Sequence, residues 1–272
     1  MPVFRNFRNR RSASDCAPTG PVCLGLILVL GVLVLTGQVS ADAPPLLQEG
    51  IRKLQSETDR WAFSQTQVTR DRSGQIKKQR IIRVDPSLKF EVRRVLISVD
   101  GRDPTNKERR KYQKEREKDR LRRQREGWQG KTIHDRINLK EARILSETDR
   151  SVVFQVPLVK NKEQRFPPEK FQLLFTINRE QEEIEQVSVS LRESIRSALV
   201  ARLDRGELVA RFSKVEPAHI APLTHLRAEG SGTVLFYRFG VTHEERRTDF
   251  RRVTPWDERF SVEFGELEFL GF

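Results

Sequence analysis

The sequence predicts a mainly β protein of the α+β class, with a curved antiparallel sheet or incomplete barrel, an N-terminal amphipathic helix and an inserted charged helix. Three observations support this fold class. Strand-like segments follow one another without intervening apolar helices, which is typical of antiparallel sheets. A short segment after residue 44 has the apolar spacing of a helix. Segment 102–126 is densely charged and nearly without apolar side chains.

The first 41 residues have the three parts of a secretory signal peptide. An arginine-rich stretch is followed by an apolar run over 22–35 and by the small residues Val39-Ser40-Ala41. We therefore expect cleavage after Ala41, a periplasmic or secreted protein, and a single mature domain over 42–272. An uncleaved anchor helix is the alternative, although the apolar run is shorter than the ~20 residues that a membrane span needs.

The composition excludes several classes of protein. The chain has 272 residues and a formal net charge of +13, and its 16 Phe argue against a wholly disordered chain. Both cysteines, Cys16 and Cys23, lie within the predicted signal peptide. The mature chain is therefore expected to form neither a disulfide nor a thiolate metal site.

The mature chain is expected to begin with a helix. Pro44-Pro45 fits a first helical turn, because proline needs no amide partner there. Leu47, Ile51 and Leu54 then follow at the spacing that places them on one helical face. The helix is expected to end near Thr58, and its apolar face should cover part of the sheet.

From Trp61 onward the apolar residues change to the two-residue period of strands, with Trp61 and Phe63 on one face. Segment 195–203 fits either a strand that pairs with 208–215 across Asp204-Arg205-Gly206 or a short helix. The other strands are expected over 76–84, 90–99, 142–147, 152–158, 171–178, 184–191, 233–241, 246–253 and 260–264.

The charged segment 102–126 contains twelve Lys or Arg and six Asp or Glu. It is expected to form a solvent-exposed helix, either self-paired or binding anionic membrane or cell-wall surfaces. Predicted export and the single aromatic residue, Tyr112, argue against nucleic acid as its partner. The candidate cations are Lys107, Arg109, Arg110, Lys111, Lys114, Arg116, Arg120, Arg122, Arg123 and Arg125.

The sequence carries no motif that identifies an enzyme. No serine lies within a G-x-S-x-G elbow, and Gly230-Ser231-Gly232 is expected to be a turn. Phosphate-binding glycine loops and helical zinc motifs are also missing. We expect no catalytic residue, metal or cofactor, although sequence alone leaves an unrecognised hydrolase open. The four histidines are expected on the surface: His134, His219, His225 and His243.

Residues 45–101 carry a helix stripe, the strand Trp61-Ala62-Phe63-Ser64-Gln65-Thr66-Gln67-Val68-Thr69, a turn at Gly74 and a turn at Asp100-Gly101. This order of elements resembles the periplasmic lipoprotein-carrier family (LolA-like). The resemblance implies a strongly curved antiparallel sheet, an incomplete barrel, with helices covering its concave face. It also implies a cavity that holds acyl chains.

An apolar sheet face needs a cover of helices, strands or a lipophilic ligand. Strand alternation selects six aromatic residues for such a face, either as core or as a lining for lipid. These candidates are Trp61, Phe63, Phe154, Phe171, Phe175 and Phe236.

Two functions follow from the sequence. The first is an exported, non-enzymatic binding or carrier protein of the cell envelope that holds a lipid or a lipoprotein acyl group. The alternative is an envelope scaffold or interaction protein that docks on anionic surfaces through the basic segment 102–126.

Overall fold

The computed structural model describes most of the chain beyond the predicted signal peptide, which lies outside the described residues together with its cleavage site. The described residues are 43–57, 59–125, 136–160, 167–197, 201–235 and 237–260.

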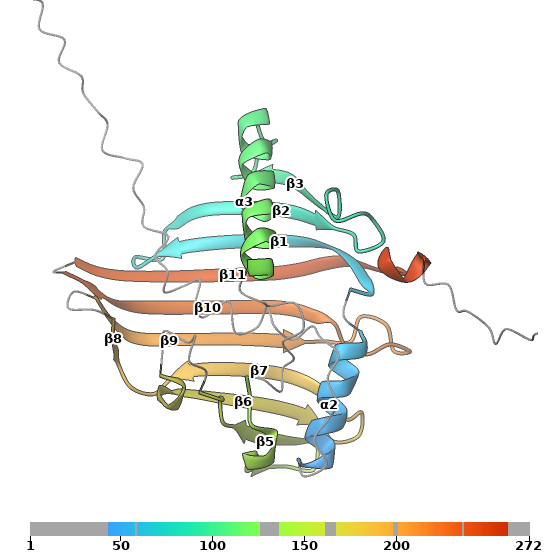
Figure 1. Cartoon of the computed structure of the whole chain (residues 1–272), viewed down its shortest axis with the longest axis vertical. Coiled ribbons are helices and arrows are strands. Elements are labelled where there is room, and N and C mark those ends of the chain that lie inside the picture. The colour runs from blue at the N-terminus through green and yellow to red at the C-terminus, as the bar shows by residue number, and fades with distance from the viewer. Residues whose placement is uncertain are drawn as a thin grey trace, which may run out of the picture.

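One antiparallel sheet of eleven strands organises the chain (Figure 1). The strand order is β3-β2-β1-β11-β10-β9-β7-β6-β5-β4, with β8 paired to β9, and the sheet does not close into a barrel. The predicted fold class is confirmed. The strands are β1 (Trp61–Asp71), β2 (Ile76–Val84), β3 (Arg94–Val99), β4 (Arg143–Glu147), β5 (Ser151–Val156), β6 (Phe171–Asn178), β7 (Glu183–Leu191), β8 (Ile195–Ser197), β9 (Ala201–Phe212), β10 (Leu223–Val234) and β11 (Tyr237–Arg252).

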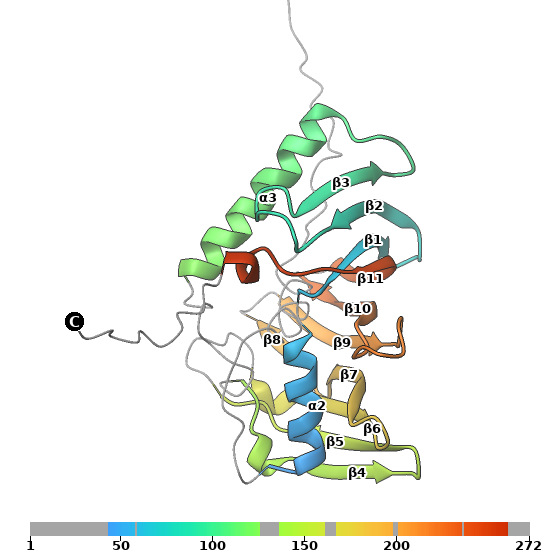
Figure 2. The ribbon, with the colours of Figure 1, turned by 90° about the vertical axis from the view of Figure 1, so that its right-hand side faces the viewer.

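Two α-helices, α2 (Pro45–Ser56) and α3 (Asn106–Arg125), lie on the same face of the sheet (Figure 2). Among the described residues, neither is long and apolar enough to cross a membrane. The described residues also form short 3-10 helices at Leu139–Glu141, Pro168–Lys170 and Asp257–Phe260.

Helix α2 packs its predicted apolar stripe on β6 and β7. Leu47 and Ile51 are fully buried, and Leu54 packs against the same cluster. At Gly50 the helix approaches so closely that a Cβ would lie 3.2 Å from side-chain atoms of Ile177 and Ile184. This first core cluster extends from β5 across the sheet to β10.

Helix α3 covers the other end of the sheet, beside β1 to β3. Its one large apolar contact is Tyr112, which is buried with Trp61, Phe63, Ile82 and neighbouring side chains in a second core cluster. The sheet face under the helices therefore has two apolar regions, one beneath each helix.

The pairing of β1 with β11 joins these two regions. Ten residue pairs run from Trp61 opposite Arg252 to Asp71 opposite Val241, with a bulge near Ala62. The N-terminal strands β1 to β3 connect to the rest of the sheet through this single ladder.

The structure corrects two predicted turns. Asp204-Arg205-Gly206 lies within the continuous strand β9, where the register shifts opposite Ser231 and Gly232, so turn-type residues form a bulge. Gly230-Ser231-Gly232 is not a turn, because it lies inside β10. Glycine occurs at closely packed positions within strands as well as in turns, so its presence does not by itself identify a turn.

Two predicted strands also differ from the structure. The segment expected as one strand over 233–241 is a hairpin, because Val234 pairs with Tyr237 across the connection between β10 and β11. The strand expected over 90–99 begins at Arg94, since residues 85–93 form turns. Beyond Phe260, the strand expected over 260–264 lies outside the described residues.

The α2 contact can be tested by removing one buried side chain. Leu47→Ala should lower the free energy of unfolding by about 2–5 kcal/mol, because it leaves a cavity under the helix. Leu121→Ala, at a side chain 41% exposed, should change it by less than about 0.5 kcal/mol. Urea denaturation measures both values, and equal losses would contradict the packing described for α2.

Candidate anion-binding surface

Helix α3 begins with a reciprocal capping box. The Thr105 amide and hydroxyl donate to Glu108 Oε2 at 2.8 Å, and the Glu108 amide donates to Thr105 Oγ1 at 3.3 Å. Arg102 adds two hydrogen bonds to the same carboxylate, at 2.8 and 2.9 Å. These contacts lower the pKa of Glu108 to about 2, with the Arg102 hydrogen bond as the largest cause. The Thr-x-x-Glu spacing is a sequence signal that the prediction overlooked.

Two of the predicted anion-binding arginines face the sheet. Arg116 donates to the carbonyl oxygens of Phe90, Glu91 and Arg94 at 2.8–3.3 Å. Its guanidinium lies 4.8 Å from the centre of the Phe90 ring, and that of Arg120 lies 5.2 Å from the same ring. Burial lowers the pKa of Arg116. Both side chains attach the helix to the protein.

The opposite side of α3 presents cations to solvent. At about 100° per residue, seven Lys and Arg side chains fall within an arc of roughly 120°, and no carboxylate shares that arc. Arg122 is half-buried and pairs with Asp119 at 3.2 Å. The other six are exposed, and no acidic partner is found for them in the described part of the chain. We call these six the cation face: Lys107, Arg110, Lys111, Lys114, Lys118 and Arg125.

Besides excluding Arg116, Arg120 and Arg122, the cation face differs from the set predicted from sequence at three residues. Lys118 belongs to it, although the prediction omitted this residue. Arg109 is exposed elsewhere on the helix and donates to the Pro104 carbonyl at 3.2 Å. The side chain of Arg123 lies outside the described residues. The charge content of the segment could not show which of these side chains point to solvent and which point to the rest of the protein.

The predicted aromatic candidates do not gather around one site. Trp61 and Phe63 lie in the second core cluster, whereas Phe154 and Phe175 are at most 2% exposed in the first. Phe171 packs partly buried against the first cluster. The sixth candidate, Phe236, lies outside the described residues. The five described rings contribute to the packing of two separate regions.

A polar network links Trp61 to the end of α2. The Trp61 ring makes edge contacts with Phe250 and His219, with ring centres 6.0 and 5.7 Å apart. Arg252 lies over the same ring and forms a double hydrogen bond with Glu57. Burial alone would raise the pKa of Glu57, but the Arg252 hydrogen bonds and charge lower it.

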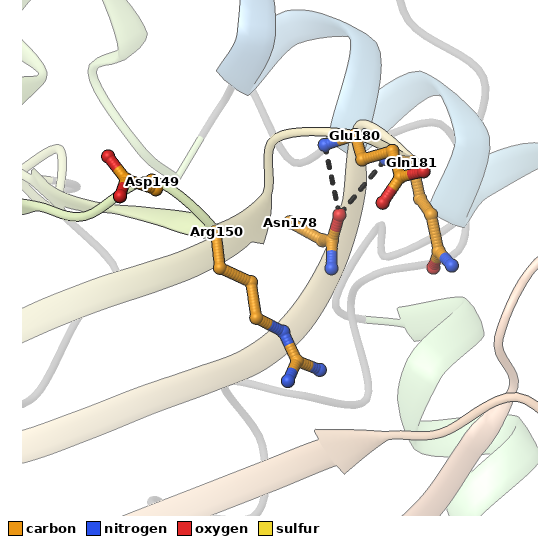
Figure 3. Close-up of a pocket in the computed structure, with 5 residues that line it drawn as sticks. All are labelled: Asp149, Arg150, Asn178, Glu180 and Gln181. Atoms are coloured by element: carbon orange, nitrogen blue, oxygen red, sulfur yellow. Dashed lines mark hydrogen bonds between the residues drawn. The ribbon is translucent and has the colours of Figure 1, made fainter.

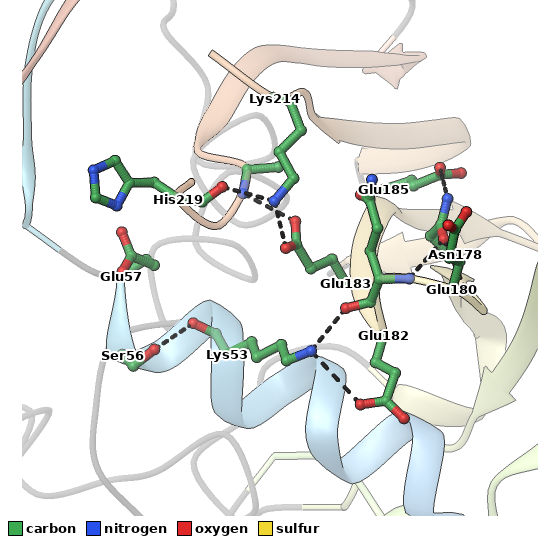
Figure 4. Close-up of polar contacts among 12 residues, drawn as sticks. Lys53, Ser56, Glu57, Asn178, Glu180, Glu182, Glu183, Glu185, Lys214 and His219 are labelled. Atoms are coloured by element: carbon green, nitrogen blue, oxygen red, sulfur yellow. Dashed lines mark hydrogen bonds and ion pairs between the residues drawn. The ribbon is translucent and has the colours of Figure 1, made fainter. Parts of the chain in front are cut away.

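Both oxygens of the buried Glu183 carboxylate accept hydrogen bonds from neighbouring groups (Figure 4). Lys214 Nζ donates to it at 2.6 Å, and the Ala221 amide donates at 3.1 Å. Nearby, Lys53 Nζ donates to the Gln181 carbonyl at 2.7 Å. Glu183 thus joins β7 to the segment after β9, and Lys53 joins α2 to the β6–β7 turn, so Glu183 has a structural role.

A shallow polar pocket lies beside the turn between β6 and β7 (Figure 3). Asn178 Oδ1 accepts from the amides of Glu180 and Gln181, each at 3.0 Å. The other lining residues are Asp149 and Arg150. None of the five described aromatic candidates lines this pocket.

The described histidines do not form a metal centre. His225 lies 3.2 Å from Glu244, and His243 lies 3.3 Å from Thr69 Oγ1, with its pKa lowered by burial. Across the described ranges, no group of three or more His, Cys, Asp or Glu is placed to hold a metal ion. His134 lies outside these ranges.

Comparisons with protein-family models, with curated proteins and with solved structures found no match.

The capping box predicts an acid-sensitive start of α3. Because the pKa of Glu108 is lowered from 4.5 to about 2 in the fold, its contribution is present above pH 4.5 and is lost as the pH falls toward 2. Backbone chemical shifts of residues 106–109 should lose helical character over that range. In Glu108→Ala they should be less helical already at pH 6, whereas Glu117→Ala should behave like the parent chain. A wild-type helix start that is unchanged at pH 2 would contradict this role.

Proposed function

We propose that the protein is a non-enzymatic binding protein of the cell envelope that docks on anionic surfaces through the cation face. The single observation that carries this proposal is the sorting of charge around α3. Six exposed cations share one side of the helix, and the carboxylates lie outside their arc.

The attachment of α3 makes this surface rigid. Tyr112 is buried in the second core cluster, and Arg116 is hydrogen-bonded to three backbone carbonyls of the 90–94 segment. The helix therefore cannot rotate without breaking these contacts. Cations that are fixed next to one another repel, and this repulsion is unfavourable for the folded helix. A polyanion relieves this repulsion.

The expected export of the chain defines the candidate partners. Anionic lipid headgroups and anionic cell-wall polymers are the polyanions of an envelope, and each Lys or Arg near an anionic membrane contributes about 1 kcal/mol. Binding of this kind weakens as salt screens the charges.

A triple variant tests the proposal. Lys107→Gln, Lys114→Gln and Lys118→Gln together should weaken binding to anionic vesicles or wall polymers by roughly 100-fold at low salt. The salt dependence of binding should become shallower as well. Co-sedimentation over a salt series measures both quantities.

The matched control removes the same charge elsewhere. Arg143→Gln, Lys160→Gln and Arg227→Gln change three exposed cations outside α3. This control should bind nearly as well as the parent chain. Equal weakening in the two triple variants would show that net charge, and not the cation face, determines binding.

A second candidate function is transport of a lipid or lipoprotein acyl group. It is supported by the open sheet with both helices on one face, which is the arrangement that the resemblance to lipoprotein carriers implies. Native mass spectrometry of gently purified protein should then detect a bound lipid. A ligand-free protein whose helix-side sheet face is filled by its own side chains would exclude this function.

A further inference from the structure

The sheet face opposite the helices carries arginines that pair with carboxylates in the middle of β10 and β11. The residues on either side of Arg227 lie in the first core cluster beneath α2, so Arg227 itself points to the opposite face. Its guanidinium pairs with Glu229 at 2.8 Å. Glu244, directly across from Arg227 on β11, pairs with Arg246 at 3.1 Å. Opposite charges are therefore matched in this part of the face.

Farther along β10, the same face carries a row of arginines. Thr233 follows Arg227 by an even number of residues and therefore shares its face. It pairs with Arg238 of β11 on one side and with Arg202 of β9 on the other. Arg202 pairs in turn with Arg196 of β8. Since directly paired residues share a sheet face, these three exposed arginines form one row across four strands.

A second row lies beside the first. Ser231, two residues before Thr233 on β10, pairs with Arg205 of β9 and with Gly240 of β11. A Cβ at Gly240 would lie 3.0 Å from Cβ of Arg72, so the missing side chain lets this residue of the β1–β2 turn lie on the same face. Arg72 and Arg205 are both exposed. Figure 1 shows β8, the start of β11 and the β1–β2 turn at one end of the sheet.

The two rows together place five arginines on one face of this end of the sheet. Only Arg202 has an acidic partner within the described residues, Asp204 at 2.6 Å. Glu207 and Glu229 lie in the next row toward the middle of the sheet, and Glu229 is already paired with Arg227. Positive charge is therefore in excess here. We call these five residues the arginine surface: Arg72, Arg196, Arg202, Arg205 and Arg238.

We propose that the arginine surface binds a linear polymer of phosphate groups. A planar guanidinium donates two parallel hydrogen bonds to phosphate oxygens. Neighbouring strands lie about 4.8 Å apart, so the row from β8 to β11 extends over roughly 14 Å and can contact several linked phosphates. Arg196 and Arg202 lie directly opposite each other, which is unfavourable for like charges, and bound phosphates remove this repulsion.

The composition of the two rows favours a polymer over a single phosphate or a bilayer. Exposed side chains in an open row hold one phosphate weakly, whereas linked phosphates gain from simultaneous contacts. A bilayer surface combines phosphates with hydrocarbon, but the paired residues of both rows are arginine, serine, threonine and glycine. These residues also include no aromatic ring on which the bases of a nucleic acid could stack.

The arginine surface is separate from the cation face. The cation face belongs to α3, which lies on the helix side of the sheet, whereas the arginine surface lies on the opposite side (Figure 2). The inference therefore does not rest on the proposed function.

The test uses the full chain with the three lysine substitutions of the cation face already in place. Adding Arg196→Gln, Arg205→Gln and Arg238→Gln should weaken binding to short-chain inorganic polyphosphate at least about 10-fold at low salt. The slope of log affinity against log salt concentration should become shallower by about 2, at roughly 0.7 for each lost phosphate contact. Isothermal titration calorimetry over a salt series measures both quantities.

The matched control removes three exposed arginines that already pair with a carboxylate. Arg227→Gln, Arg246→Gln and Arg251→Gln remove the same formal charge from the same parent chain. This control should bind polyphosphate within about 3-fold of its parent, and both triple variants should unfold within about 5 °C of it. Equal weakening in the two triple variants would overturn the inference, because net charge alone would then explain the binding.

Vesicles distinguish a phosphate polymer from a bilayer as the partner. With the cation face intact, the three substitutions in the arginine surface should leave binding to vesicles of phosphatidylcholine mixed with phosphatidylglycerol within about 3-fold of the parent chain. A loss of vesicle binding as large as the loss of polyphosphate binding would overturn the assignment to a polymer. The lysine variant tests the proposed function with the arginine surface intact, so either proposal can fail while the other stands.

Discussion

The ladder between β1 and β11 is the interaction on which the rest of the structure depends. It pairs a strand that begins at Trp61 with one that ends at Arg252. Without it, β1 to β3 and the second core cluster would have no sheet partner in the remainder of the fold. The contacts of Arg252 with Glu57 and the Trp61 ring reinforce this junction and connect it to α2. Formation of the complete sheet therefore requires contact between the two ends of the described chain, which carries a large loop-closure cost.

The attachment of α3 follows from its composition. A helix with one buried aromatic residue cannot be held by an apolar stripe. Hydrogen bonds from Arg116 to the carbonyl groups of Phe90, Glu91 and Arg94 hold it in addition. A guanidinium suits this task because its donors spread in one plane. In our proposal, this mode of attachment also determines which cations are available for binding. Side chains used for attachment point inward, and the unpaired cations are left on the opposite side.

The sequence predicts the elements whose signals are local and fails where tertiary context decides. The stripe of Leu47 and Ile51 predicts α2 correctly, and strict alternation predicts β6. Asp204-Arg205-Gly206 has turn chemistry, yet the chain uses it as a bulge because pairing with β10 continues on both sides. The β10–β11 turn has no turn chemistry at all, so no local pattern could reveal it. Alternation also assigns each aromatic ring to a sheet face, but it cannot tell which rings become neighbours.

Two features of the chain are unfavourable for different physical reasons. Glu183 is a buried carboxylate, and Lys214 and a backbone amide compensate its burial completely. Such compensation identifies a residue that serves the fold. Leu235, with φ of 55° and an exposed side chain, is an unfavourable feature of another kind, because its cost lies in the backbone.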